Sequence, residues 1–274
     1  MPHYRQITNH REREKGVIVY PVYSRRSGGL SVGINLFPDK KDCPFDCPYC
    51  EVFPFSTGAV FSLKQMEEDL RIAIKDALEQ NTPIKDLCFS GNGEPSLSAA
   101  VPDALKMAAN IRKELAPSAK LVLITNGAGL LQPSIFSMLA QAVIDEIALD
   151  IWLKLDAGTS EWYKKINRSS ILFTELTEKI KEFAFLAPVT IQTMLCAVDG
   201  EFPYQTEARA WERLALELAV TGNIRKVQIY SKVRPAPEDP LASPLPGDYL
   251  EQRAASLLRA FSAQGITTPV EVYI

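Results

Sequence analysis

Three cysteines, Cys43, Cys47 and Cys50, lie in the short segment DCPFDCPYCEV. Thiols spaced this closely face a common centre, and a disulfide would use two of them and strand the third. A closed structural zinc site usually has four ligands, and the nearest histidines, His3 and His10, lie far upstream. A cubane iron–sulfur cluster has four irons, so three cysteines leave one iron open to an outside ligand. The spacing therefore favours such a cluster over an incomplete zinc knuckle.

The composition is that of an intracellular enzyme. The chain has 274 residues, of which 46% are hydrophobic, and this allows one large core and one or two domains. Five cysteines, three of them clustered, argue against a secreted disulfide framework. The N-terminal sequence has no apolar h-region, so we expect no signal peptide, and no apolar run has the length of a membrane span. We therefore expect a cytoplasmic protein that does not enter a membrane.

Charge is unevenly distributed along the chain. The net charge of −3 gives no general attraction to nucleic acid, but the first segment is basic. We interpret this segment as a solvated face or an unstructured arm in preference to a phosphate-binding patch. Its charged residues are Arg5, Arg11, Arg13, Lys15, Arg25 and Arg26.

Strand-like and helix-like segments alternate through the rest of the chain. The apolar patterns predict strands at Leu30–Leu36, Asp86–Ser90, Lys120–Thr125, Asp145–Leu155, Val189–Leu195 and Arg225–Tyr230. They predict helices at Ser62–Gln80, Ser98–Leu115, after Pro133, and at Thr174–Leu186, Thr206–Val220 and Tyr249–Phe261. Ser62 and Gln65 can form a capping box. The proline-rich segment Ser231–Gly247 reads as a loop, and Pro269–Ile274 as a short terminal strand.

This alternation predicts an α/β fold with a parallel sheet covered by helices. Six strand–helix units suit a partial (β/α)6 barrel of parallel strands better than a full barrel of eight. We expect a basic N-terminal extension over residues 1–28, the barrel core over 29–232, and a proline-rich loop with a C-terminal helix and strand over 233–274. Each candidate motif follows the C-terminal end of a strand, where folds of this kind carry the loops that form the active site.

The second motif is Ser90-Gly91-Asn92-Gly93-Glu94, followed by a proline. Glycines at a strand end let the backbone approach a ligand closely, and the Glu94 carboxylate can face a cationic group. The alternative is a tight turn with a capping acid. Thr125 and Asn126, after the next strand, either make polar ligand contacts or form a plain turn.

Lys154 and Asp156 lie two apart on a strand and therefore point to one face. Lys154 is a candidate for holding a substrate anion or for acid–base chemistry, and Asp156 is a candidate for binding ribose hydroxyls. The alternative is a structural ion pair between the two. Arg234, near the end of the sixth strand with Tyr230 and Ser231, can bind a carboxylate or phosphate. We assign the remaining cysteines, Cys88 and Cys196, to core packing.

With the aromatic Tyr49 before the last cysteine, the first motif resembles the Cys-x3-Cys-x-aromatic-Cys hallmark of the radical S-adenosylmethionine (radical SAM) superfamily. The resemblance implies a partial barrel and a [4Fe-4S] cluster on Cys43, Cys47 and Cys50. It also implies that S-adenosylmethionine chelates the open iron, and that the segment 90–94 resembles the Gly-Gly-Glu-type element that binds its amino group. Asn92 stands where many members carry glycine. The implied cofactor-binding residues are Tyr49, Ser90, Gly91, Asn92, Gly93, Glu94, Thr125 and Asn126.

The implied reaction is reductive cleavage of S-adenosylmethionine to a 5′-deoxyadenosyl radical, which takes a hydrogen atom from the substrate. A flavodoxin- or ferredoxin-like protein is the expected electron donor. The order of SGNGEPSL, ITNGAG, LKLDAGTSEWYKKINR and VRPAPE is similar to a bacterial subgroup related to the tRNA wyosine-base synthases. Those enzymes carry further N-terminal cysteines, and this sequence has none before Cys43. The tRNA-modifying activity is therefore not carried over.

Three functional hypotheses remain open at this point. The first is a radical SAM enzyme that acts on a nucleic-acid base, RNA included, or on a small metabolite. The second is an activating enzyme that places a glycyl radical on a partner protein. The third is a non-catalytic metal-binding protein.

Overall fold

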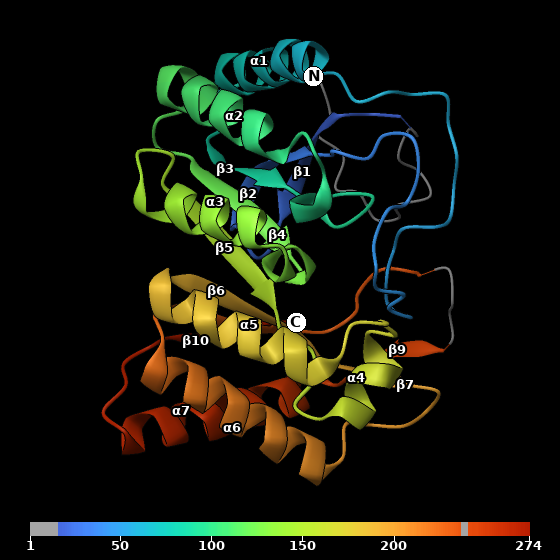
Figure 1. The fold of residues 1–274 in the computed structure, drawn as a ribbon, viewed down its shortest axis with the longest axis vertical. Coiled ribbons are helices and arrows are strands. Elements are labelled where there is room, and N and C mark those ends of the chain that lie inside the picture. Colours follow the sequence, from blue (N-terminus) through green and yellow to red (C-terminus); the bar gives the residue numbers. More distant parts are fainter. Residues whose placement is uncertain (1–15, 237–240) are drawn as a thin grey trace. The chain divides into compact units, whose positions relative to one another are not determined.

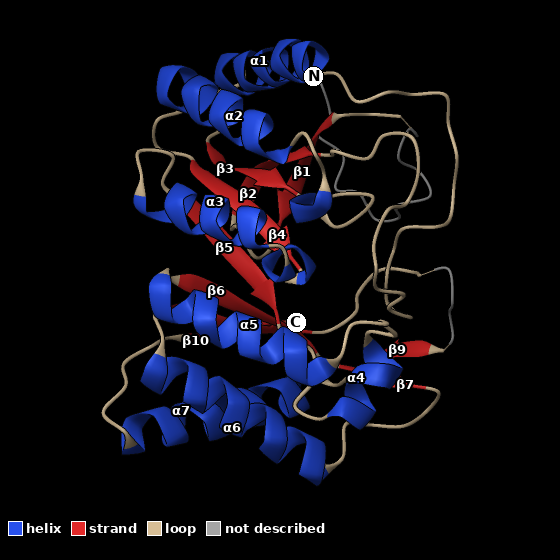
Figure 2. Cartoon of the chain, viewed as in Figure 1, coloured by secondary structure: helices blue, strands red, loops and turns tan. Residues whose placement is uncertain are grey.

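The structure is a computed structural model that describes residues 16–236 and 241–274. The chain divides into two compact units. The first comprises Met1–Cys43, Val52–Thr125 and Gln141–Asp150, and the second comprises Pro44–Glu51, Asn126–Ala140 and Ile151–Ile274. Figure 1 labels the elements, and Figure 2 separates strands from helices by colour.

The first unit is built on four strands. Its elements are β1 (Val19–Ser24), β2 (Gly29–Ile34), α1 (Leu63–Glu79), β3 (Ile84–Phe89), the short 3-10 helix η2 (Pro95–Leu97), α2 (Val101–Leu115) and β4 (Lys120–Thr125). β1 pairs with β2 in antiparallel fashion, whereas β2–β3 and β3–β4 are parallel pairs. Two elements, α3 (Pro133–Ile144) and β5 (Leu149–Lys154), contribute residues to both units.

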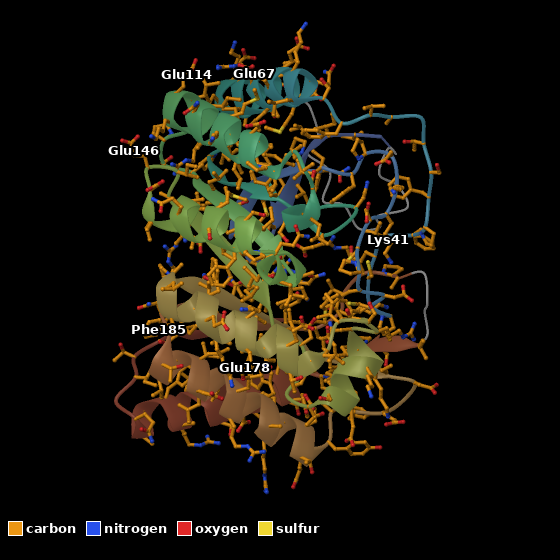
Figure 3. All side chains as sticks on the ribbon, viewed as in Figure 1. Lys41, Glu67, Glu114, Glu146, Glu178 and Phe185 are labelled. Atoms are coloured by element: carbon orange, nitrogen blue, oxygen red, sulfur yellow. The ribbon has the colours of Figure 1, made fainter. Side chains whose placement is uncertain are left out.

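The helix α1 forms because its sequence carries one apolar stripe and a good N-cap. Met66, Leu70 and Ile74 are completely buried along this stripe. Ser62 caps the helix by accepting a hydrogen bond from the Gln65 amide at 3.3 Å. The Gln65 side chain donates to Asp69 in place of completing the capping box. On the outer surface, Arg71 of α1 pairs with Glu67 and with Glu114 of α2, both labelled in Figure 3.

The second unit contains the remaining parallel strands and three long helices. Its elements are the 3-10 helix η3 (Ala128–Leu131), α4 (Ser160–Ile166), α5 (Phe173–Leu186), β6 (Val189–Met194), β7 (Cys196–Val198), α6 (Gln205–Thr221), β8 (Ile224–Tyr230), β9 (Ala242–Pro244), α7 (Gly247–Ala263) and β10 (Val270–Tyr273). β5–β6, β6–β8 and β8–β10 are parallel pairs, and β7 pairs with β9 in a separate antiparallel ribbon.

The two faces of the parallel strands in this unit differ in polarity. Ile191, Val227 and Ile229 are fully buried on the face that packs against helices, where the α6 residue Trp211 donates its indole N–H to Thr193 at 3.1 Å. On the opposite face, Gln192 donates to Gln228 at 2.7 Å, and both side chains are completely buried. A parallel sheet is normally apolar on both faces, so the polar face distinguishes this half of the fold.

These observations confirm the predicted fold class, an α/β fold whose parallel strands are followed by helices in the order that a partial (β/α)6 barrel requires. The terminal strand expected at Pro269–Ile274 is present as β10. Within the described residues, no helix is long and apolar enough to cross a membrane. The predicted division into extension, core and C-terminal segment stays a prediction.

Several predicted elements need correction. The predicted basic extension contains β1, whose Val19 and Tyr20 pack in the core of the first unit. The segment Ser231–Gly247 includes β9 and is therefore not a continuous loop. The segment Asp145–Leu155 holds a strand as expected, and its bounds are Leu149–Lys154. The predicted basic residues Arg5, Arg11, Arg13 and Lys15 lie outside the described residues.

We predict that Gly33→Ala destabilises the first unit. Gly33 lies opposite Tyr20 across the β1–β2 pair, and a Cβ there would lie 2.2 Å from the tyrosine ring. Displacing the ring also breaks its hydrogen bond to Ser90 (2.7 Å), so we expect a loss of about 1–3 kcal/mol in the free energy of unfolding. Denaturant unfolding measures this change. Gly58→Ala is the control, since a Cβ there meets nothing within 4 Å. Equal losses in the two variants would contradict the packing argument.

Candidate functional site

The three clustered cysteines lie on one loop that follows β2. Cys43 is the last residue of its segment in the first unit, and Cys47 and Cys50 belong to the second. The Cys50 amide donates to the Cys47 carbonyl at 2.9 Å, so the Cys47–Cys50 segment forms a tight turn. As whole residues all three cysteines are partly exposed, and none is in a disulfide. The described residues contain no group of three or more His, Cys, Asp or Glu that could hold one metal ion.

In the first unit, the start of this loop is bonded to the glycine-rich segment. The Asp42 amide donates to the Asn92 carbonyl at 3.1 Å, and the Glu94 amide donates to the Asp42 carbonyl at 2.8 Å. These bonds form a parallel bridge between Asp42 and Gly93. A Cβ on Gly93 would lie 2.1 Å from the Asp42 carbonyl oxygen, so this position requires glycine. The structure thus brings the predicted cysteine loop and the predicted Glu94 loop together.

The Glu94 carboxylate is buried and oriented by hydroxyl groups. One of its oxygens, Oε1, accepts hydrogen bonds from the Ser96 amide (3.1 Å), from the Ser96 hydroxyl (2.6 Å) and from the Thr125 hydroxyl (2.6 Å). The Thr125 side chain therefore contacts the Glu94 carboxylate directly. Ser96, which sequence reasoning missed, lies two residues after Glu94 and fixes the carboxylate in place.

Asn35 holds the rest of the glycine-rich segment. It is completely buried, and its side-chain oxygen accepts from the amides of Phe37 and Asn92, each at 3.1 Å. Gly91 adopts a φ of +126° directly beside this side chain, a conformation that favours glycine. The Asn92 side chain donates to the Phe37 carbonyl at 3.2 Å, which anchors the residue that departs from the family pattern.

In the second unit, the buried carboxylate of Asp156 is the centre of a hydrogen-bond network. Its Oδ1 accepts from the Met194 amide at 2.8 Å and lies 3.2 Å from the Lys154 ammonium. Its Oδ2 accepts from the Tyr49 hydroxyl at 2.5 Å and from the Asn167 side-chain amide at 3.0 Å. Both carboxylate oxygens are therefore occupied by groups of the protein.

The Lys154 ammonium is enclosed by aromatic rings. It lies 4.8 Å from the centre of the Tyr49 ring and 5.2 Å from that of Tyr230, and it donates to the Tyr230 hydroxyl at 2.8 Å. Burial lowers the pKa of Lys154, but the charge of Asp156 and the contact with Tyr230 raise it more, so the net shift is upward. The lysine is thus held as a cation.

Cys47 lies beside this network. Burial is the largest cause that raises the pKa of its thiol, to about 11, and the charge of Asp156 adds to it. The Asn167 side chain, which the sequence analysis did not select, donates to the Cys47 sulfur at 3.5 Å. Asn167 follows the short helix α4, which was itself not predicted. The sequence signal that could have identified Asn167 is its place near the end of the segment LKLDAGTSEWYKKINR, directly after the residues that form α4.

The other predicted site residues have mainly structural contacts. Ser90 bonds Tyr20, and the Asn126 side chain accepts from the Ala128 amide at 2.9 Å within a turn. Arg234 pairs with Glu51 at 2.9 Å. Cys88 and Cys196 are buried in the core as predicted, and burial raises the pKa of Cys196 to about 12. The assignment of Lys154 and Asp156 as catalytic stays a prediction.

A small pocket opens beside Lys154 and Asp156 within the second unit. Its lining includes the aromatic side chains Phe45, Tyr163 and Phe173. Lys154, Asp156 and Asn167 also line it, so the pocket combines aromatic walls with polar groups.

We predict that Gly93→Ala opens the bridge between Asp42 and Gly93. The added methyl group meets backbone, which cannot move aside as a flexible side chain can. We expect the Glu94 amide to exchange with deuterium at least about tenfold faster, which corresponds to the loss of roughly one buried hydrogen bond. Hydrogen–deuterium exchange resolved to this segment measures the rate. Gly58→Ala serves as the control, and an unchanged Glu94 amide would refute the bridge.

Comparison with known proteins finds similar sequences and similar solved structures. No family model matches the chain. The UPF0026 protein of Helicobacter pylori strain 26695 is 31% identical over 176 residues, 60% of this chain and 54% of that protein. The chain thus spans about half the length of this curated relative.

Solved structures show the fold more completely. Streptococcus suis SuiB bound to S-adenosylmethionine matches with a TM-score of 0.65 at 13% identity, over 86% of this chain and 49% of SuiB. The enzyme anSMEcpe with bound AdoMet matches with a TM-score of 0.55 at 14% identity, over 88% of this chain and 63% of that one. The chain therefore shares the fold of these two proteins, each of which was solved with bound S-adenosylmethionine.

Proposed function

We propose that this protein is a radical SAM enzyme that binds a [4Fe-4S] cluster through Cys43, Cys47 and Cys50 and binds S-adenosylmethionine beside Glu94. The observation that carries the proposal is the pair of main-chain hydrogen bonds between Asp42 and the segment Asn92–Glu94. They join the loop of the first cysteine to the loop that carries the buried carboxylate. A fold match alone would not require this contact.

The donor set fits the cluster. Three thiols on one loop are suited to a cubane, in which each thiolate binds a different iron and the fourth iron accepts an outside ligand. When bound, the cluster and S-adenosylmethionine supply the electron transfer and the radical that abstracts hydrogen.

In this proposal, the chain's own residues bind and orient S-adenosylmethionine. Glu94 offers a buried carboxylate, and the Ser96 and Thr125 hydroxyls fix one of its oxygens. A cationic amine that meets this carboxylate gains a charge-assisted hydrogen bond in a site of low dielectric constant. S-adenosylmethionine carries such an amine, and it is bound in the SuiB and anSMEcpe structures.

The proposal includes an electron donor of the flavodoxin or ferredoxin type, and a substrate that is a nucleic-acid base, in RNA or free, or a small metabolite. The aromatic lining of the pocket beside Lys154 suits the binding of a planar or apolar substrate group. Lys154, held as a cation, suits an anionic group on the same molecule.

We predict that Cys47→Ala abolishes cluster-dependent cleavage of S-adenosylmethionine. Removing one of three thiolate ligands leaves an iron without its protein bond. The assay is anaerobic reconstitution with iron and sulfide, reduction with dithionite, and quantification of 5′-deoxyadenosine. Cys88→Ala is the matched control, because it removes a buried thiol of β3 and should leave iron content unchanged. Cleavage retained by Cys47→Ala, or zinc uptake without iron by the wild type, would overturn the proposal.

We predict that Glu94→Gln weakens the binding of S-adenosylmethionine. Losing the negative charge removes a charge-assisted hydrogen bond, worth about 10- to 100-fold in affinity. Isothermal titration calorimetry on the reconstituted protein gives the dissociation constant. Glu146→Gln is the control, because Glu146, labelled in Figure 3, is exposed and pairs with Lys113 at 2.8 Å. Equal affinity in the Glu94 variant would remove this residue from the site.

A further inference from the structure

We propose that Asn167 is a positioning residue for the Cys47 thiolate, and that its side-chain N–H sets the reduction potential of the cluster. This inference rests on the proposed function, because it assigns Cys47 as a cluster ligand. It concerns a residue outside the three cysteines and outside the glycine-rich segment.

Asn167 contacts the cysteine loop through both its backbone and its side chain. Its carbonyl oxygen accepts from the Asp46 amide at 3.0 Å and lies 3.8 Å from the Cys47 sulfur. Its side-chain Nδ2 lies 3.5 Å from the same sulfur. Asn167 is only 3% exposed, so water does not compete for these contacts. The residue thus holds the loop on two sides of Cys47.

Asp156 fixes which way the asparagine amide points. The carboxylate oxygen Oδ2 lies 3.0 Å from Asn167 Nδ2, and an ionised carboxylate can only accept hydrogen bonds. The NH2 group of Asn167 must therefore face Asp156, which leaves its second N–H for the Cys47 sulfur. Lys154, at 3.2 Å from Asp156, balances the negative charge of this carboxylate. The orientation of the amide follows from these partners rather than from the asparagine alone.

The helix α4 holds Asn167 at this place. Asn167 caps the C-terminus of α4, and its amide donates to the Tyr163 carbonyl at 2.9 Å. The Tyr163 ring packs edge-on against Phe45 of the cysteine loop, with ring centres 5.7 Å apart. This ring contact joins the cysteine loop to α4 beside Cys47.

A hydrogen bond to a ligand thiolate has a defined electrochemical effect. Adding an electron to an iron–sulfur cluster increases the negative charge on its sulfur ligands, and an N–H donor stabilises that charge. The donor therefore stabilises the reduced cluster more than the oxidised one. Removing it should make the midpoint potential more negative and the cluster harder to reduce.

The test compares Asn167→Ala and Asn167→Leu with the wild type and with Asn110→Ala. Leucine keeps the branched shape of asparagine without the N–H, and Asn110 is an exposed residue of α2. After anaerobic reconstitution, the electron paramagnetic resonance signal of the reduced cluster is followed during a redox titration. We expect both Asn167 variants to hold a cluster with a more negative midpoint potential, and Asn110→Ala to match the wild type.

Two outcomes separate this inference from the function on which it rests. A wild type that takes up no cluster overturns the proposed function. A wild-type cluster whose potential and resonance signal are the same in Asn167→Ala and Asn167→Leu overturns the role of Asn167 alone. Reduced iron uptake in variants with the wild-type circular dichroism spectrum supports the positioning role.

Discussion

The arrangement of the second unit around the candidate site depends on the partners of one buried carboxylate, that of Asp156. An unpaired carboxylate in a protein interior costs several kcal/mol, and Asp156 is 4% exposed. Four donors meet it: an amide of β6, a lysine of β5, a tyrosine of the cysteine loop and an asparagine after α4. Because these donors come from four segments, the carboxylate can be satisfied only when all four are in place. The charge thus ties the loop of Cys47 to the strands that carry the sheet.

The two halves of the candidate site are held by different kinds of contact. In the first unit, main-chain bonds and the requirement for glycine at position 93 hold Asp42 against the glycine-rich segment. In the second unit, charged and polar side chains hold Cys47. Asn92 fits into this segment because its amide donates to the Asn35 side chain and its own side chain donates to the Phe37 carbonyl. Side-chain contacts do not tolerate substitution, because each donor meets one specific acceptor.

Local patterns made much of the site predictable. The cysteine spacing and the Glu94 segment are short motifs, and the apolar stripe of α1 identifies the helix and its cap. What escaped prediction depends on partners distant in sequence. The basic residues of the N-terminal segment obscured the strand β1. Its apolar residues can be recognised as a strand only once their pairing with β2 is known. The helix α4 is one of the shortest helices, and Asn167 acquires its role from Cys47 and Asp156, which no periodicity places beside it.

The bridge between Asp42 and Gly93 also bears on the order in which the chain acquires its structure. The two residues are far apart in sequence, and the strands β2 and β3 that precede them must pair before they can meet. Non-local contacts of this kind form late in folding, because loop closure comes before any gain from the contact. The loop of Cys43 therefore reaches its final shape only after the first unit has folded. The proposed cluster is consequently expected to be inserted into a folded chain rather than into a nascent one.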